Sequence, residues 1–546
     1  MSEIDKSQNK FTKKTINFAK KNSDYVFNLF LFFYLILGFY LSANTGISID
    51  ELADQYIGKT NVEAIKYFFG YNENGYLNLL EFQDKFHGAG FQYISQIYIL
   101  IASIIVKLEK FSEETSKILL SHNLIFFTFF LSGIFAKKIV NLLIKDKLYS
   151  NIFLIFYLFY PYLLGHGFYN PKDMPFLFAW ILSTYISIRI FLKIYENENV
   201  SFLNFFFLSL STSFLISIRI PGILIFLQYL ITFIITSSLL RDPFYKILKI
   251  YFYKIFLFLC FTLLLSILCY PIFWKNPLII FDAINKIIDY PLGVCTLTLG
   301  KCMEATKLPY NYIFIWLFFK LPILSLIGLM LFPFAERKIF SQPTRQIILG
   351  SILLTLISII LILIFLEANI YDELRHVLYI VPLILIISFS ITYFFSKKLL
   401  LYVAFLSIFS FSIQNINMYP YQYTWFNLFS NFININSNFE LDYWGVSGRN
   451  IAEKINNNDQ LLHYRDKCIY VPLPKHIIEP FISTDFNCIK PSLSIYPKST
   501  EKYILVKYTR LIRREDPSNC KLIIEESYNL NLFKDKLIMG KVFICN

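Results

Sequence analysis

Charged residues are scarce in this chain. Only 16% of its 546 residues are Asp, Glu, Lys or Arg, against roughly 25% in soluble domains. The scarcity excludes an ordinary soluble enzyme. The formal charge of +13 comes from short Lys and Arg clusters and not from one basic domain, so nucleic acid is excluded as a partner. Hydrophobic residues make up 56% of the chain, and we predict a multi-span membrane protein whose basic clusters are topology signals.

Two further patterns are missing from the sequence. It has no duplicated halves of the kind found in many transporters. It also has no His or Cys cluster at the spacing of a metal site. The sequence therefore assigns no cofactor, and a divalent cation stays an open alternative.

Long apolar runs are the main positive feature. About 11 of them have roughly 17–22 residues, enough to cross the hydrocarbon core at about 1.5 Å per residue. They cover about 25–43, 117–135, 148–166, 175–192, 201–218, 222–239, 251–269, 310–331, 346–366, 377–394 and 399–415. A lysine-rich segment, 1–24, precedes the first run, which is too long for a cleaved signal peptide. We predict a cytoplasmic N-terminus and a transmembrane domain over 25–415.

One more apolar run, 90–106, decides the topology. If it crossed the membrane, every later basic cluster would lie outside; if it does not, those clusters lie inside, as the positive-inside rule prefers. We therefore predict that this run lies in or dips into the outer face. It then forms part of a long first external loop, 44–116.

With this topology, acidic and basic residues from distant segments meet on the outer side. Asp50 and Glu51 follow the first span, Asp173 lies between two prolines, and Arg219 ends a helix. Charges at membrane depth are costly unless paired or solvated. Such a set is suited to a sugar on a polyprenyl phosphate: arginine stabilises the phosphate, and a carboxylate removes the proton of the attacking hydroxyl. The other candidate substrate-binding residues are Lys85, His87, Asn170, Lys172, Arg375 and His376.

Several motifs resemble those of one enzyme family. They include "IDE" at 49–51, "KFHGAGF" at 85–91, "NPKDMPF" at 170–176, "SIRIPG" at 217–222 and "YDELRHVLYIVP" at 371–382. The chain resembles the GT-C superfamily of polyprenyl-phosphate-sugar-dependent glycosyltransferases, near glycosyltransferase family 39, which includes protein O-mannosyltransferases and lipid A aminoarabinose transferases. The resemblance implies a GT-C fold and an inverting displacement. It places the catalytic acids at Asp50, with Glu51 beside it, and Asp173.

The composition changes after about residue 416. No later run is long enough to span, and short β-branched or aromatic segments at 468–474, 503–508, 521–526 and 541–545 predict strands. A helix is expected over 448–455. We predict a small extracytoplasmic α/β domain over 416–546. Cysteines in outward-facing segments predict at least one disulfide, with the pairing left open. They are Cys295, Cys302, Cys468, Cys488, Cys520 and Cys545.

The sequence thus predicts a multi-pass glycosyltransferase of the plasma (inner) membrane. Its donor is a polyprenyl-phosphate-linked sugar, and its acceptor is a hydroxyl of a glycan, a lipid or a protein. Two alternatives stay open: a transporter or flippase for a lipid-linked glycan, and a polyprenyl-linked glycan ligase or polymerase. A transporter places charged groups near the bilayer midplane, whereas here they gather at one surface.

Overall fold

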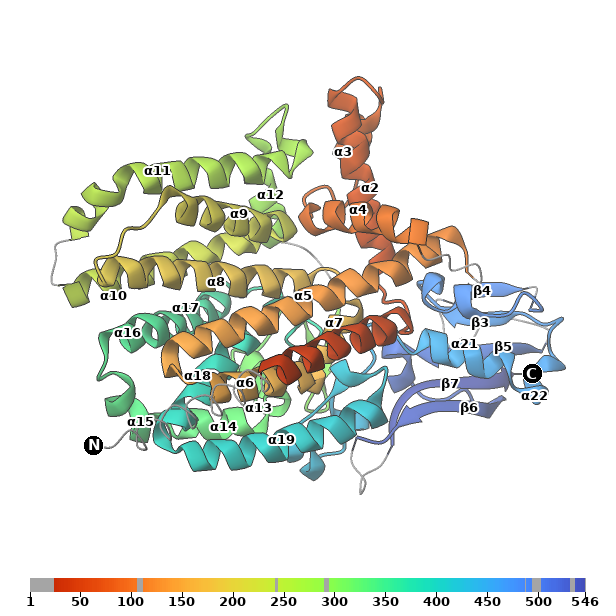
Figure 1. Ribbon diagram of the computed structural model, residues 1–546. Helices are drawn as coiled ribbons and strands as arrows, with labels where there is room; N and C mark the ends of the chain where they lie inside the picture. The colour runs from red at the N-terminus through yellow and green to blue at the C-terminus, as the bar shows by residue number, and fades with distance from the viewer. Residues whose placement is uncertain are drawn as a thin grey trace, which may run out of the picture.

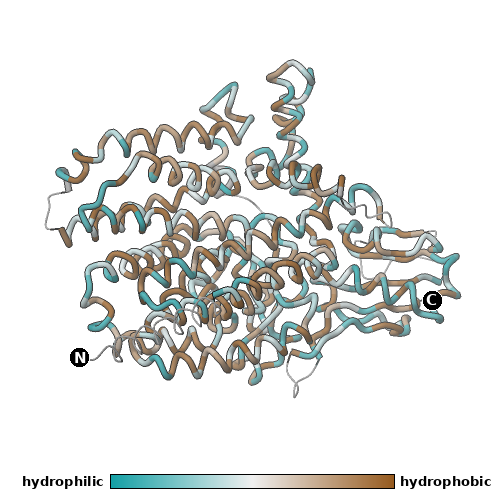
Figure 2. The backbone as a smooth tube through the Cα atoms, in the orientation of Figure 1, coloured by the Kyte–Doolittle hydropathy of each residue, from teal (hydrophilic) through white to brown (hydrophobic). Residues whose placement is uncertain are grey.

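Long apolar helices run side by side through most of the molecule, and a β-sheet lies at one end of them (Figure 1). The computed structural model describes residues 24–105, 111–240, 244–288, 294–486, 488–492, 502–530 and 536–545. Nearly all of the predicted basic segment 1–24 lies outside these residues. The hydropathy colouring shows the helices to be brown along most of their length (Figure 2).

Within the described residues, seven helical segments are long and apolar enough to cross a membrane. They are Asp24–Ala43, α5 (Glu113–Ile144), α8 (Asp173–Tyr195), η1 with α10 (Ile220–Leu224 and Ile225–Leu240), α11 (Phe244–Leu268), α16 to α17 (Pro343–Arg345, Gln346–Gly350 and Ser351–Phe365) and α19 (Lys397–Met418). Local signals set the ends of α5. The Ser112 side chain accepts from the N–H of Thr115 at its start, and Lys145 adopts a left-handed conformation after its end.

Two further apolar segments are long enough to cross a membrane only when each is taken as one helix pair with a bend. The helix axis bends by 61° between α6 (Lys147–Phe159) and α7 (Pro161–Tyr169). It bends by 117° between α13 (Tyr312–Lys320) and α14 (Ile323–Met330). The run 310–331 was expected to be one straight span. It breaks because Pro322 has no N–H to continue the helix. The remaining predicted runs form the shorter helices α9 (Phe202–Ile218) and α18 (Ile380–Phe395), so every predicted run falls on helix.

The ambiguous run forms α4 (Gly90–Ile105). Ile97, Leu100 and Ile104 keep 61%, 68% and 78% of their surface exposed, which is the pattern of a helix with one face against lipid. Its location at the outer face stays a prediction. Before it, α2 (Glu51–Phe68) and α3 (Gly75–Glu81) form an arm that projects from the bundle (Figure 1).

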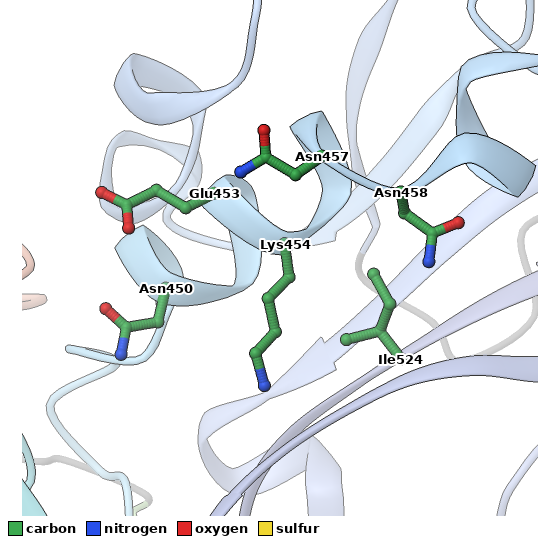
Figure 3. A pocket seen from close by; sticks show the side chains of 6 residues that line it. All are labelled: Asn450, Glu453, Lys454, Asn457, Asn458 and Ile524. Carbon is green, nitrogen blue, oxygen red and sulfur yellow. The ribbon is translucent and has the colours of Figure 1, made fainter.

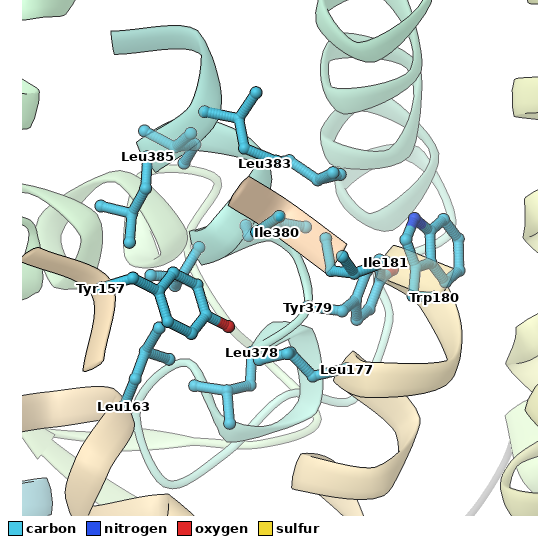
Figure 4. Packing of buried hydrophobic residues seen from close by; sticks show 14 of the residues in the cluster. Tyr157, Leu163, Leu177, Trp180, Ile181, Leu378, Tyr379, Ile380, Leu383 and Leu385 are labelled. Atoms are coloured by element: carbon cyan, nitrogen blue, oxygen red, sulfur yellow. The ribbon is translucent and has the colours of Figure 1, made fainter. Parts of the chain in front are cut away.

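The helical core is filled by large side chains. Trp180 of α8 stacks on Tyr379 at 4.2 Å between ring centroids, beside Ile181 and the α18 residues Ile380 and Leu383 (Figure 4). This packing fixes the start of α18 against α8. The start of α8 and the segment before α18, which both carry charged residues, are therefore held side by side.

The smaller elements are η2 (Pro271–Phe273), α12 (Ile279–Ile288), β1 (Cys295–Thr298), β2 (Lys301–Glu304), α15 (Phe332–Ile339), η4 (Arg375–Val377), η5 (Gln422–Thr424), η6 (Leu428–Phe432) and α20 (Ile435–Asn438).

The C-terminal part contains a five-stranded sheet with strand order β4-β3-β5-β7-β6. Its strands are β3 (Ile469–Pro472), β4 (Ile489–Ser492), β5 (Tyr503–Tyr508), β6 (Cys520–Tyr528) and β7 (Leu537–Cys545). β3 is parallel to β4 and β5, whereas β7 is antiparallel to β5 and β6. The four predicted strands correspond to β3, β5, β6 and β7. The helices and turns around the sheet are α21 (Gly448–Asn456), α22 (Asp459–Leu462), η7 (Lys475–Ile477), η8 (Glu479–Phe481) and η9 (Thr509–Arg513).

Three disulfides join the six cysteines named above. Cys295 pairs with Cys302 across the β1–β2 hairpin, Cys468 with Cys488, and Cys520 with Cys545. The prediction of at least one bridge is confirmed, and the structure supplies the pairing that spacing left open.

Candidate functional site

Six charged side chains from four separate segments form one group, here called the charge cluster. Asp50 lies at the N-cap of α2 and Asp54 one turn later. Asp173 begins α8, Lys172 precedes it, and Arg219 follows the last residue of α9. The cluster consists of Asp50, Asp54, Lys172, Asp173, Arg219 and Arg375, the last at the start of η4.

Each cation of the charge cluster faces one carboxylate of the same cluster. Lys172 Nζ lies 2.8 Å from Asp54 Oδ1, and Arg219 Nη2 lies 2.6 Å from Asp173 Oδ1. Arg375 Nη2 lies 3.0 Å from Asp50 Oδ2. The three pairs together carry no net charge. The Asp50 side chain keeps 33% of its surface exposed, more than any other member, so it is the carboxylate most open to a substrate.

Asn170 organises the turn that presents Lys172 and Asp173. Its side-chain oxygen accepts from the backbone N–H groups of both residues, and its Nδ2 donates to Asp173 Oδ2 at 3.0 Å. This is the local bonding by which Asn favours turns and helix starts. Asn170 is fully buried. The structure therefore places it behind Asp173, as an orienting group.

The Arg375 guanidinium is held between two aromatic rings. Its Cζ lies 4.9 Å from the Tyr371 ring centroid and 4.6 Å from that of Trp444. Its Nε donates to His376 Nε2 at 3.3 Å. Stacking and hydrogen bonds on several sides fix the planar group in one orientation. No pattern in the sequence points to Trp444, which is 69 residues further along the chain.

The pKa values of Asp50 and Asp54 are shifted in opposite directions within the charge cluster. Burial raises the pKa of Asp50, but the charges of Arg375, Lys172 and Arg219 outweigh this and bring it below the ordinary value. Asp50 is therefore ionised at neutral pH. Burial dominates at Asp54 and raises its pKa to about 6 in spite of Lys172. Asp54 was not selected from the sequence, although its spacing of four residues from Asp50 places both on one helical face.

Two histidines expected at the site lie near the charge cluster. Burial, together with the charges of Lys172 and Arg219, lowers the pKa of His87. Burial and Arg375 lower that of His376 well below its ordinary value. Both rings are neutral at pH 7, so they serve as hydrogen-bonding groups and not as cations.

The loop that carries His87 packs closely on the end of α9. A Cβ at Gly88 would overlap the carbonyl oxygen of Ser217, and one at Gly90 would overlap the Ser217 hydroxyl. Only glycine permits this approach. The "HGAG" sequence therefore brings the loop after α3 against the residues that precede Arg219.

Two expected residues do not join the charge cluster. Glu51 is 2% exposed and its Oε1 lies 2.6 Å from Nε2 of the fully buried His122. Because this carboxylate points into the bundle, its position does not suit the role of a base. Lys85 donates to the carbonyl of Leu80 at 2.6 Å, which closes the turn after α3. Neighbouring residues of a helix point in different directions, so Asp50 and Glu51 lie on different faces at the start of α2 although they are adjacent in sequence.

Cavities in the C-terminal part are lined by other residues. One, of about 490 Å³, lies over α21 and is lined by Asn450, Glu453, Lys454, Asn457, Asn458 and Ile524 (Figure 3). A second, of about 390 Å³, is lined by Asn417, Tyr419, Tyr421, Glu526, Ser527, Tyr528 and Asn529. No member of the charge cluster contributes to either lining.

A divalent ion was left open by the sequence. Among the described residues, no three His, Cys, Asp or Glu side chains are grouped as ligands. The three carboxylates of the charge cluster each face a Lys or an Arg. This donor set does not fit a cation, and no step below involves one.

Comparison with known proteins finds similarity to solved structures, but not to family models or curated sequences. No family model matches the chain, and no curated protein matches its sequence. A solved structure is similar: "Crystal Structure of ArnT from Cupriavidus metallidurans in the apo state". The two chains are 10% identical, with a TM-score of 0.47, and the similarity covers 96% of this chain and 98% of that one. At that identity and score the comparison assigns no activity to this chain.

Proposed function

We propose that this chain is a membrane glycosyltransferase that moves a sugar from a polyprenyl-phosphate donor to an acceptor hydroxyl at the outer face of the membrane. The observation that carries the proposal is the charge cluster. It joins three cations with three carboxylates from the start of α2, the start of α8, the end of α9 and the turn before α18, and its most exposed acid lies 3.0 Å from Arg375. A lipid-linked sugar phosphate requires a site with cations for its phosphate and a carboxylate beside its sugar.

The cations act on the donor. The Arg375 fork and the Arg219 and Lys172 charges lie within one cluster, where a phosphate oxygen can replace a carboxylate partner. Bond cleavage leaves the electron pair on the phosphate oxygen. The cations stabilise this growing charge more strongly than the charge of the bound donor, which lowers the barrier.

Asp50 acts on the acceptor. Its ionised carboxylate accepts the proton of the acceptor hydroxyl while that oxygen bonds to the anomeric carbon. The bond from the anomeric carbon to the phosphate oxygen breaks in the same step. The products are the glycosylated acceptor, polyprenyl phosphate and a protonated Asp50, and a single displacement inverts the anomeric configuration.

The test uses membranes that contain the full chain and a panel of radiolabelled polyprenyl-phosphate sugars. We expect label to leave the lipid with the wild type and the Glu113→Gln control, whose carboxylate lies on the exposed start of α5, but not with Asp50→Asn. Near-normal transfer by a folded Asp50→Asn protein would refute the assignment.

Two further variants test the donor site. Arg219→Ala and Arg375→Ala are expected to raise the KM for the donor. Unchanged donor saturation in both would contradict the phosphate role. Movement of an intact lipid-linked glycan across the membrane, without release of the sugar, would favour the transporter alternative.

A further inference from the structure

Asp372 lies between two arginines that come from different parts of the chain. Its Oδ2 lies 3.5 Å from Arg375 Nη1, and its Oδ1 accepts a hydrogen bond from Arg510 Nη2. Arg510 belongs to η9, which directly follows β5 of the C-terminal sheet. The Asp372 side chain is only 5% exposed. One buried carboxylate therefore connects the sheet to the proposed phosphate-binding arginine.

The turn that carries Asp372 is held by its backbone. Asp372 and Glu373 have φ values of 56° and 66°, in the left-handed region that non-glycine residues rarely adopt. The N–H of Asp372 donates to Thr296 Oγ1 at 2.8 Å, and that of Glu373 donates to Tyr312 Oη at 3.1 Å. Because both N–H groups are bound to fixed side chains, the Asp372 carboxylate keeps its distance to Arg375.

Charge balance around Arg375 depends on this arrangement. Without Arg510, two carboxylates, Asp50 and Asp372, would share the single Arg375 guanidinium. The uncompensated negative charge would hold the guanidinium and repel an incoming phosphate at low dielectric. With Arg510 present, Asp372 is neutralised from its far side.

We infer that Arg510 is a positioning residue that acts through Asp372 to keep the Arg375 guanidinium available to an anionic phosphate. The C-terminal sheet is then a working part of the donor site. This inference rests on the proposed function and names the part of the chain that sets its donor affinity.

The experiment measures donor KM and kcat for the full chain in nanodiscs. Arg510→Gln is expected to raise KM about tenfold with kcat changed less than about twofold, the size typical of coupling within one charge network. Arg510→Lys is expected to recover part of the loss. Asp372→Asn combined with Arg510→Gln is expected to return KM to within about threefold of the wild type, because the harmful charge is gone.

The control is Arg513→Gln. Arg513 lies in the same short helix and makes a similar ion pair, 3.0 Å from Glu440 Oε2, but Glu440 does not contact Arg375. Since the Arg513 charge acts on Asp372 only through space, the KM of Arg513→Gln is expected to rise less than about threefold. An equal rise in KM for Arg513→Gln would overturn the inference, because it indicates that the docking of η9 is loosened. No rise in KM for Arg510→Gln would also overturn it, because Arg510 and Arg375 would then not be coupled.

A binding measurement separates this inference from the proposed function. Farnesyl phosphate is titrated against each purified full-length protein. If the wild type transfers no sugar, the proposed function fails, and weaker binding of farnesyl phosphate by Arg510→Gln but not by Arg513→Gln still supports the role of Arg510. Equal binding by both variants and the wild type overturns it, and so does a wild type that does not bind the phosphate.

Discussion

The buried pair Lys320–Glu373 provides a sharp test of how the turn beside the charge cluster is anchored. Lys320 Nζ lies 2.9 Å from Glu373 Oε1, and neither side chain is exposed. The Lys320 ammonium also donates to the Tyr423 carbonyl and lies 4.0 Å from the Phe426 ring centroid. Removing one partner leaves the other buried polar group without its hydrogen bond, which costs about 1–3 kcal/mol.

The perturbation is a double-mutant cycle. Glu373→Gln and Lys320→Met are each expected to lower the free energy of unfolding by about 1–3 kcal/mol, whereas the double variant loses less than the sum of the two. Unfolding by SDS in mixed micelles supplies the free energies. Additive losses in the double variant would show that the two side chains do not depend on each other and would refute the reasoning.

The same pair predicts a dependence of stability on pH. Burial raises the pKa of Glu373 from 4.5 to about 8, so the folded protein binds a proton that the unfolded chain releases. This contribution to stability is complete below about pH 4.5 and is lost as the pH rises toward 8, by at most about 1.4 kcal/mol per pH unit. Glu373→Gln is expected to remove this slope; an unchanged slope would assign it to another group.

Three further predictions concern neighbouring groups. Glu51→Ala is expected to lower the free energy of unfolding by about 3 kcal/mol because it leaves the buried Nε2 of His122 without its partner, with the transfer rate per folded molecule unchanged; a selective loss of kcat would instead make Glu51 catalytic. Since the pKa of Asp54 is raised to about 6, the free energy of unfolding should fall as the pH rises from about 4 to 6. Asp54→Asn should make the free energy of unfolding less dependent on pH between these values. Replacing Cys295 and Cys302 with Ser is expected to cost about 2 kcal/mol in chemical unfolding; an unchanged midpoint would contradict a structural role for this bridge.

Much of the helical architecture follows from hydropathy. Each predicted run falls on helix because crossing a membrane requires a long apolar segment with internally satisfied backbone bonds. The break at Pro322 shows the limit of this reasoning, because a 117° bend does not change the mean hydropathy of the run. The strand β4 was missed for a related reason: it has four residues, and Pro491 interrupts the β-branched pattern.

The candidate site was only partly predictable. The topology predicted from the sequence places Asp50, Asp173, Arg219 and Arg375 on one side of the membrane. The structure brings these four residues into one cluster. Their functional roles stay a proposal. Partners fixed by tertiary contacts, such as Trp444 on Arg375, carry no signal at the level of sequence spacing.

Trp444, which lies against Arg375, and Arg510, which binds its partner Asp372, are synthesised after the helical bundle. A ribosome delivers the helical bundle first, and the residues that complete the surroundings of Arg375 emerge last, about 70 and 135 positions later. A nascent or C-terminally truncated protein can therefore insert into the bilayer with an incomplete donor site. Completion of translation is thus the event that supplies the last residues of the proposed donor site.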